Sequence, residues 1–332
     1  MNSKLTPYLV ALGVMALLAL FPLLVKLVAP EMWELTAHIG IKILLNVGFG
    51  LCLWLMLQAG ELSLGQGGFI TIGAYTTGIL VAKYKLISIV WLGYLAGAVA
   101  AAILALMLGY LIVHLKRIFF LLVTWSFAEM LHPVLTSFDH PFGGAMGIID
   151  IPGPEGLSLF SETWTGYYYI ALVYGFAVLW IVWRLAGSKI GLINKSIGQN
   201  DTLVTFCGLH VRKYKVMVFV VGCFITGIGG GILASYLSAI SPETFTFFTS
   251  LDIIMFNLIG GMGTMAGPIV GAVILSGLNE YLFAVGYWRM VVYGLIIIFF
   301  ITLLPGGMVS LPAVVRARFS RKVEKQEAAH HG

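Results

Sequence analysis

The chain has 332 residues, of which 60 % are hydrophobic and 10 % are charged, and its formal net charge is +5. Its mean hydropathy is +0.99. Because a soluble domain carries roughly 25 % charged residues, this composition excludes a water-soluble globular protein and predicts an integral membrane protein.

Stretches free of Asp, Glu, Lys and Arg mark the predicted spans, since a helix needs roughly 20 apolar residues to cross a bilayer. The first candidate, Tyr8–Ala29, contains only Lys26 near its end, and Ile118–Leu135 contains Glu129. The remaining candidates, in chain order, are Ile43–Gly60, Leu62–Ala82, Ser88–Val113, Gly166–Trp183, Val216–Pro242, Ile253–Asn279 and Met290–Val315. None shows the alternating pattern of a barrel strand. We therefore expect an all-α integral membrane protein with eight to ten transmembrane helices, in which Ile253–Asn279 can hold two short segments.

The charges of the loops predict the orientation of the chain. Residues 184–215 hold six basic residues and a single acid, and the tail 316–332 is also basic, whereas 138–165 holds four acids and no Lys or Arg. By the positive-inside rule, 187–215 and the tail face the cytoplasm and 138–165 forms an outer loop. Lys83 and Lys85 fall on the outer side in this scheme, but the larger biases outweigh them. The N- and C-termini are both predicted to be cytoplasmic.

The segment Gly60–Gly78, "GELSLGQGGFITIGAYTTG", is rich in glycine for a membrane span. Its glycines can bring helices into close contact, or they can interrupt a helix so that free backbone groups line a cavity. A similar segment, Leu258–Gly277, occurs in the second half, and matched Gly-interrupted segments point to the pathway of a transporter. We therefore predict two related halves with Gly-rich short or broken segments.

Glu129 is the deepest charge within a predicted span, where a charge costs roughly 2.5–3.5 kcal/mol to insert. It either belongs to the translocation path or a partner contact, or is satisfied by a neighbouring helix or by water near the outer surface. The residues predicted to lie on or beside a substrate pathway are Ser63, Gly65, Gln66, Gly67, Gly68, Tyr75, Glu129, Gly260, Gly261 and Gly263. Whether Ser63, Gln66 or Tyr75 touches a substrate is left open.

The inner loop Gly187–Lys215 is predicted to form two short amphipathic helices on the cytoplasmic face. Ser188 can cap the first, whose isoleucines recur at roughly helical spacing, and "NDTL" at Asn200 can start the second. Gly208 is expected to end it.

Several kinds of chemistry are missing from the sequence. There is no G-x-x-x-x-G-K-[ST] loop for ATP, no metal-spaced Cys/His set and no spacing that suggests a nucleophile with its base. The sequence therefore predicts no enzyme, no catalytic residue, no metal, no cofactor and no nucleic-acid partner. Transport against a gradient would need a partner or a coupled ion.

Five motifs in order resemble the permease subunit of ATP-driven (ABC) importers for branched-chain amino acids. They are "GELSLGQGGFITIGAYTTGIL", "FFLLVTWSFAEML", the outer-loop pattern "GG..GI..IP.P" at Gly143–Pro154, "LHVRKYKVMVFVVGCFITGIGGGILASYLSAISPETF" and "IIMFNLIGGMGTMAGPIVGAVIL". The resemblance covers roughly Leu44–Pro305. It implies a single permease domain over 1–332, in two structurally related halves, within a prokaryotic cell (inner) membrane.

The resemblance also implies partners: a homologous second permease, two cytoplasmic ATPase subunits and an extracytoplasmic substrate-binding protein. The loop 187–215 would dock the ATPase, through residues that match or stand in the family pattern: Gly191, Asn200, Leu203, Val204, Gly208, Leu209, Tyr214 and Lys215. Leu203 and Val204 replace a common alanine pair, and fewer arginines than usual precede Asn200. The same class of permease also serves urea, short amides and other amino acids. An ion-coupled secondary transporter is the alternative from another class.

Overall fold

The computed structural model describes residues 20–22, 25, 33–87, 89–115, 117–154, 163–282, 288–303 and 307–310. Most of the predicted first span, Tyr8–Ala29, and the whole basic tail 316–332 lie outside the described residues. Within the described part the only strand-like pairing is an isolated antiparallel bridge between Ile148 and Ile240. The prediction of an all-α membrane protein is confirmed.

Five helices in the described ranges are long and apolar enough to cross a membrane. They are α2 (Trp33–Gln58), α4 (Val90–Ile112), α5 (Arg117–Ser137), α7 (Thr163–Ala186) and α10 (Val211–Leu237). Shorter apolar helices pack among them: α3 (Gln66–Gly78), which continues as a π-helical turn η2 (Ile79–Lys83), α11 (Phe247–Gly260), α12 (Ala266–Tyr281) and α13 (Arg289–Leu303). The predicted span Ile253–Asn279 thus falls in two helices, α11 and α12. The total of eight to ten crossings stays a prediction.

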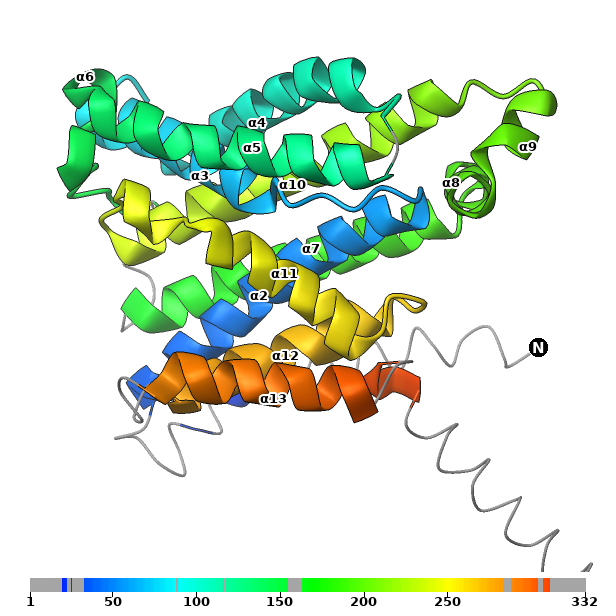
Figure 1. The fold of residues 1–332 in the computed structure, drawn as a ribbon. Coiled ribbons are helices and arrows are strands. Elements are labelled where there is room, and N and C mark those ends of the chain that lie inside the picture. The colour runs from blue at the N-terminus through cyan, green and yellow to red at the C-terminus, as the bar shows by residue number, and fades with distance from the viewer. Residues whose placement is uncertain are drawn as a thin grey trace, which may run out of the picture.

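The helices lie in layers (Figure 1), with α3, α4, α5 and α10 on one side and α12 and α13 on the other. Between them lie α2, α7 and α11, and α2 contacts α7, α10, α11 and α12. The charge-free window predicted that this helix begins at Ile43, because the window excludes the charged residue Lys42. In the structure α2 begins at Trp33 and includes Lys42. Lys42 is accommodated by an ion pair with Glu280 of α12.

The two long loops lie at opposite ends of the helix bundle (Figure 1). The short helices α8 (Lys189–Gln199) and α9 (Asp201–Phe206) lie at one end, here called the basic end. Residues 138–154, with α6 (Asp139–Phe142) and the 3-10 turn η3 (Gly144–Met146), lie at the other, here called the acidic end. The 138–154 loop is held there by hydrogen bonds of 2.9 Å in both directions between the Ile148 and Ile240 backbones. A further 3-10 turn, η5 (Pro242–Thr244), follows Ile240, and η7 (Met308–Ser310) follows α13.

A four-helix pattern occurs twice, in opposite directions. In α2–α5 and again in α10–α13 a long helix is followed by a stretch without α-helix, a short α-helix and two more α-helices. Helix α2 ends at the basic end, where Gln58 lies against Gly198 of α8, whereas α10 begins there, beside α9. Two halves of opposite direction are the inverted repeats common in transporters, and they agree with the predicted two related halves.

Glycines allow the closest helix contacts in the core. A Cβ atom on Gly73 of α3 would lie 2.2 Å from the carbonyl oxygen of Gly227 of α10. A Cβ on Gly97 of α4 would lie 2.6 Å from the carbonyl oxygen of Gly73. Helix α3 is therefore held between α4 and α10 with backbone directly against backbone, as small residues permit in membrane proteins.

Candidate functional site

The short helix α3 begins inside the bundle rather than at its surface. The chain leaves the basic end at Gln58 and runs without helical structure through residues 61–65 before α3 starts at Gln66 (Figure 1). Two hydroxyls hold this stretch, since Leu64 N–H donates to Thr124 Oγ1 (3.2 Å) and Gly65 N–H donates to Ser63 Oγ (3.1 Å). Irregular backbone at membrane depth needs such internal partners. The predicted broken segment is confirmed.

Three glycines of this segment, Gly65, Gly67 and Gly68, each face a neighbouring helix. A Cβ on Gly65 or Gly68 would meet Thr124 or Ala128 of α5 at 3.0–3.2 Å, and one on Gly67 would lie 2.7 Å from Ser250 Oγ of α11. Gly67 N–H also donates to that hydroxyl over 2.9 Å. The helix is therefore interrupted and the same glycines permit close packing, while a cavity lined by the freed backbone groups stays a prediction.

The polar side chains predicted for the pathway are buried in the chain itself. Ser63 and Gln66 have 0 % exposure and Tyr75 has 3 %. Gln66 Oε1 accepts from Thr226 Oγ1 of α10 (3.0 Å), whereas the Tyr75 hydroxyl has no hydrogen-bond partner among the described residues. These side chains are not presented to a ligand in this conformation.

The second Gly-rich segment joins α11 to α12. A Cβ on Gly260 would lie 1.8 Å from the Gly267 carbonyl oxygen, so these two helices cross with their backbones in contact. Gly261 has a φ of +119°, which favours glycine at the turn, and Gly263 is exposed with open space around it. Gly260 and Gly261 serve the α11–α12 crossing, whereas the structural counterpart of residues 59–65 is the stretch 238–246 before α11, which holds only the 3-10 turn η5.

Glu129 lies on the exposed face of α5. The exposed residues of this helix recur every three or four positions, and Ser126 and Glu129 occur among Ile118, Leu122, Trp125 and Met130. No hydrogen bond or ion pair of the Glu129 carboxylate occurs within the described ranges. Helix α5 is also the least buried of the five long helices, with 17 % of its apolar window buried against 67 % for α10.

The two short helices at the basic end form as the sequence predicts. Ser188 Oγ accepts from Gly191 N–H at the start of α8 (3.3 Å), and Asn200 Oδ1 accepts from Leu203 N–H at the start of α9 (3.1 Å). After α9 the chain turns at Gly208, which has a φ of +80°. The expected caps and the expected stop are confirmed.

The side chains of α8 and α9 divide into an inner and an outer set. Val204 and Gly191 are buried against the bundle, whereas Leu203 is 61 % exposed. Phe206 (84 %) and Leu192 (63 %) are also exposed, and neither is among the residues predicted to dock the ATPase. We call Leu192, Leu203 and Phe206 the apolar patch. Of the other predicted docking residues, Asn200 is exposed and Leu209, Tyr214 and Lys215 are partly buried.

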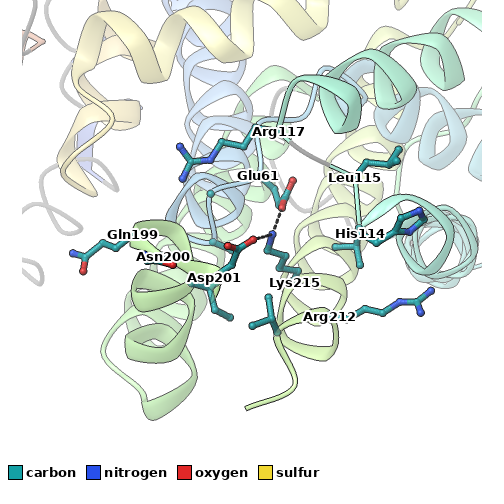
Figure 2. A pocket seen from close by; sticks show the side chains of 14 residues that line it. Glu61, His114, Leu115, Arg117, Gln199, Asn200, Asp201, Arg212 and Lys215 are labelled. Atoms are coloured by element: carbon teal, nitrogen blue, oxygen red, sulfur yellow. Dashed lines mark ion pairs between the residues drawn. The ribbon is translucent and has the colours of Figure 1, made fainter. Parts of the chain in front are cut away.

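A polar cavity of about 430 Å³ lies between α8–α9 and the start of residues 59–65. Figure 2 shows the Lys215 side chain of α10 between Glu61 and Asp201. Lys215 Nζ lies 2.7 Å from Glu61 Oε1 and 3.8 Å from Asp201 Oδ2. Burial raises the pKa of the Glu61 carboxyl, and the hydrogen bond from Lys215 acts in the opposite direction. The sequence did not predict this cluster, because its members are far apart along the chain.

No group of three or more His, Cys, Asp or Glu side chains that could hold a metal ion occurs in the described ranges.

Residues 38–301 match the model of a protein family that is described as branched-chain amino acid transport system, permease component. The chain is 28 % identical to the LivM permease protein of the high-affinity branched-chain amino acid transport system of Escherichia coli, over 92 % of this chain and 75 % of the relative. It is 26 % identical to the L-arabinose ABC transporter permease AraH of Azospirillum brasilense, over 68 % of this chain and 65 % of the relative. It is 30 % identical to the ribose import permease RbsC of Haemophilus influenzae, over 43 % of this chain and 48 % of the relative. No solved structure matches.

Proposed function

This chain belongs to the family of permease components of branched-chain amino acid transport systems, and on that basis we propose that it translocates branched-chain or other hydrophobic amino acids as part of an ATP-driven importer. The energy comes from two ATPase subunits, and the substrate arrives on an extracytoplasmic binding protein. A homologous second permease completes the pathway.

The observation that carries the proposal is the apolar patch at the basic end. Phe206, at 84 % exposed, lies on a helix whose start is capped by Asn200 and whose inner side is fixed by buried Val204. A fixed helix that presents Leu and Phe to its surroundings is typical of a protein interface. The positive-inside rule assigns this end to the cytoplasm, where the ATPase subunits would be.

The exposed stripe of α5 faces the second permease and the pathway between the two permeases. A carboxylate on a lipid-facing helix surface costs roughly 2.5–3.5 kcal/mol, which disfavours lipid as the neighbour of Glu129. The start of α3 lies directly behind α5, with Gly65 against Thr124 and Gly68 against Ala128. The buried residues Ser63, Gln66 and Tyr75 then act beside the pathway, through the position of α3.

The relatives support more than one substrate class. LivM is named for branched-chain amino acids, whereas RbsC and AraH are named for ribose and arabinose. We favour amino acids because the LivM match spans most of both chains, while the ribose match covers less than half of this one. Urea and short amides are further substrate alternatives within this permease class.

The experiment is uptake by the complete transporter, reconstituted in proteoliposomes with a second permease, the ATPase subunits and the binding protein. We expect ATP-dependent uptake of labelled leucine or valine but not of labelled ribose, with ATPase subunits that co-purify with the permease. Ribose uptake alone would replace the substrate assignment. Uptake that persists with inactivated ATPases, and that follows a proton or sodium gradient, would favour the ion-coupled alternative.

A further inference from the structure

Lys215 of α10 connects the basic-end helix α9 to the non-helical stretch before α3. Asp201, the first residue of α9, and Glu61 are both within ion-pair distance of Lys215 Nζ, at 3.8 and 2.7 Å. The Glu61 and Lys215 side chains are 5 % and 11 % exposed, whereas that of Asp201 is 60 % exposed (Figure 2). The buried ion pair Glu61–Lys215 is therefore linked through Asp201 to the exposed helix α9.

Helix α8 abuts the same turn by direct backbone contact. A Cβ on Gly198 would lie 2.3 Å from the Gln58 carbonyl oxygen, so no side chain fits between α8 and the end of α2. The Gly198 carbonyl oxygen accepts a hydrogen bond from Arg117 Nη2 (2.6 Å). Arg117 begins α5, so α8, the end of α2 and the start of α5 meet at one point.

Hydrogen bonds hold the backbone between Glu61 and the first turn of α3. Glu61 N–H donates to the Met56 carbonyl oxygen (3.2 Å), and Leu64 N–H donates to Thr124 Oγ1 (3.2 Å). At the far end Gly67 N–H donates to Ser250 Oγ (2.9 Å). Glu61 and the start of α3 are therefore joined by a short stretch of backbone whose position is fixed by hydrogen bonds to neighbouring helices.

We propose that Glu61 and Lys215 are positioning residues that transmit movement of α8 and α9 to the interrupted helix α3. The inference rests on the proposed function, in which α8 and α9 receive the ATPase. The two side chains touch neither nucleotide nor substrate in this role. They make the docking helices and the start of α3 move as one unit.

The energetics of buried ion pairs allow a transmitting role to be distinguished from a purely stabilising one. Removing one partner leaves an uncompensated buried charge, which destabilises a protein strongly, whereas replacing both partners by apolar residues of similar size is often neutral. If the pair only stabilises the fold, a doubly apolar variant restores both folding and transport. If the pair transmits movement, that variant folds and assembles but stays uncoupled.

The variant is Glu61→Leu with Lys215→Met, measured in the complete reconstituted transporter. Nucleotide hydrolysis, substrate uptake and the amount of ATPase subunit retained on the permease are determined together. We expect the ATPases to stay bound and hydrolysis to continue, while the ratio of ATP hydrolysed to substrate imported rises about 5-fold or more, a factor equal to the lower end of the range for coupled binding at two sites.

The matched control is Arg212→Met in the same cavity. Arg212 donates to the Tyr110 carbonyl oxygen and lies over the Tyr110 ring, and Figure 2 shows its side chain directed away from Glu61. We expect this variant to keep the wild-type ratio. A raised ratio in Arg212→Met as well would show a general effect of the cavity and would overturn the assignment to Glu61 and Lys215.

A wild-type ratio in the double variant overturns the proposal, as does loss of the ATPase subunits, which would make the pair part of the docking surface. If the double variant fails to reach the membrane, Glu61→Gln decides by the same ratio, because Lys215 then keeps Asp201 as a partner. Failure of the proposed function is distinguishable, since the wild-type complex itself would then show no ATP-dependent uptake.

Discussion

The backbone N–H of Gly67 donates to Oγ of Ser250 over 2.9 Å, and this bond joins the first turn of α3 to the first turn of α11. Gly78, at the end of α3, lies against Ile148 and Ile151 of the acidic end. The turn after α11 lies near the end of α2, where Trp54 Nε1 donates to the Met262 carbonyl oxygen (3.1 Å). The two short helices therefore begin together inside the bundle and run to opposite ends.

The first prediction concerns Gly67→Ala. The new Cβ would lie 2.7 Å from Ser250 Oγ, so this hydroxyl must move and its hydrogen bond from Gly67 N–H, which joins the first turns of α3 and α11, is strained or lost. Overpacking of this kind costs about 1–3 kcal/mol, and we expect a lower unfolding temperature and reduced uptake. Gly277→Ala in α12 is the control, because open space surrounds that position. Unfolding followed by fluorescence-detected size exclusion checks both, and equal melting of the two variants would contradict the prediction.

A second prediction tests the backbone contact between α3 and α10. Gly73→Ala places a Cβ 2.2 Å from the Gly227 carbonyl oxygen, and no side-chain rotation can relieve a clash with backbone. We expect loss of folded protein in the membrane rather than a specific transport defect. Gly175→Ala in α7, whose Cβ would sit at an ordinary 3.5 Å from the Leu44 carbonyl oxygen, should express normally. Normal expression of Gly73→Ala would show that the α3–α10 contact is looser than described here.

Local signals predicted the helices and their ends well. Ser188, Asn200 and Gly208 act on the backbone within a few residues of themselves, so the limits of α8 and α9 follow from sequence alone. Charge-free windows located every described span but began α2 and α10 too late, because Lys42 and Lys215 are charged residues inside helices. Each of these lysines is satisfied by an acid from elsewhere in the chain.

Long-range relationships could not be predicted in the same way. Glycine enrichment paired Gly60–Gly78 with Leu258–Gly277, yet the second segment marks a helix crossing, and the matching interruption before α11 carries no glycine between residues 238 and 246. Glycine content therefore located close backbone approaches and two helix breaks, but it did not locate the interruption before α11. The Glu61–Lys215 ion pair likewise depends on how α2 and α10 lie relative to each other, and a local sequence pattern cannot predict that arrangement.

The third prediction concerns the apolar patch. Phe206→Asp and Leu203→Asp each place a charge in the proposed interface, where it would be desolvated, so we expect the ATPase subunits to be lost while the permease stays folded. Val204→Asp should instead destabilise the permease itself, because Val204 is 7 % exposed and a buried unpaired carboxylate is strongly unfavourable. Co-purification and melting temperature, measured on all three variants, separate the two effects. Full retention of the ATPases by Phe206→Asp would remove the patch from the interface.

The fourth prediction concerns Glu129→Gln on the exposed face of α5. Gln keeps the size and removes the charge, so folding of the single chain should be unchanged, since the carboxylate has no bonded partner in the described ranges. If this face borders the pathway or the second permease, we expect uptake to fall while the ATPases remain bound. Ser126→Ala serves as the control on the same face. Unchanged uptake and unchanged pairing of the permeases would favour a carboxylate that is only wetted near the surface.

The fifth prediction is a pH dependence of coupling that arises from Glu61. Burial raises the pKa of this carboxyl above its ordinary value of 4.5, Lys215 and Arg117 oppose that rise, and Asp201 adds slightly to it. Since the folded-state pKa lies above the unfolded value, the contribution of Glu61 to folding stability is fully present below 4.5 and is lost as the pH rises through the folded-state pKa. Acidification from the folded-state pKa of Glu61 down to 4.5 therefore does not lower the folding stability through protonation of this carboxyl.

Protonation of Glu61 does, however, remove the charge that pairs with Lys215. We expect the ratio of ATP hydrolysed to substrate imported to rise when the ATPase side of the proteoliposome is acidified, beginning above the ordinary Glu range, while the unfolding temperature does not fall. Glu61→Gln should show the raised ratio at every pH and no transition. Because His114 lines the same cavity and is unchanged in that variant, a transition that survives in Glu61→Gln would assign the pH dependence to another group and break the link to this ion pair.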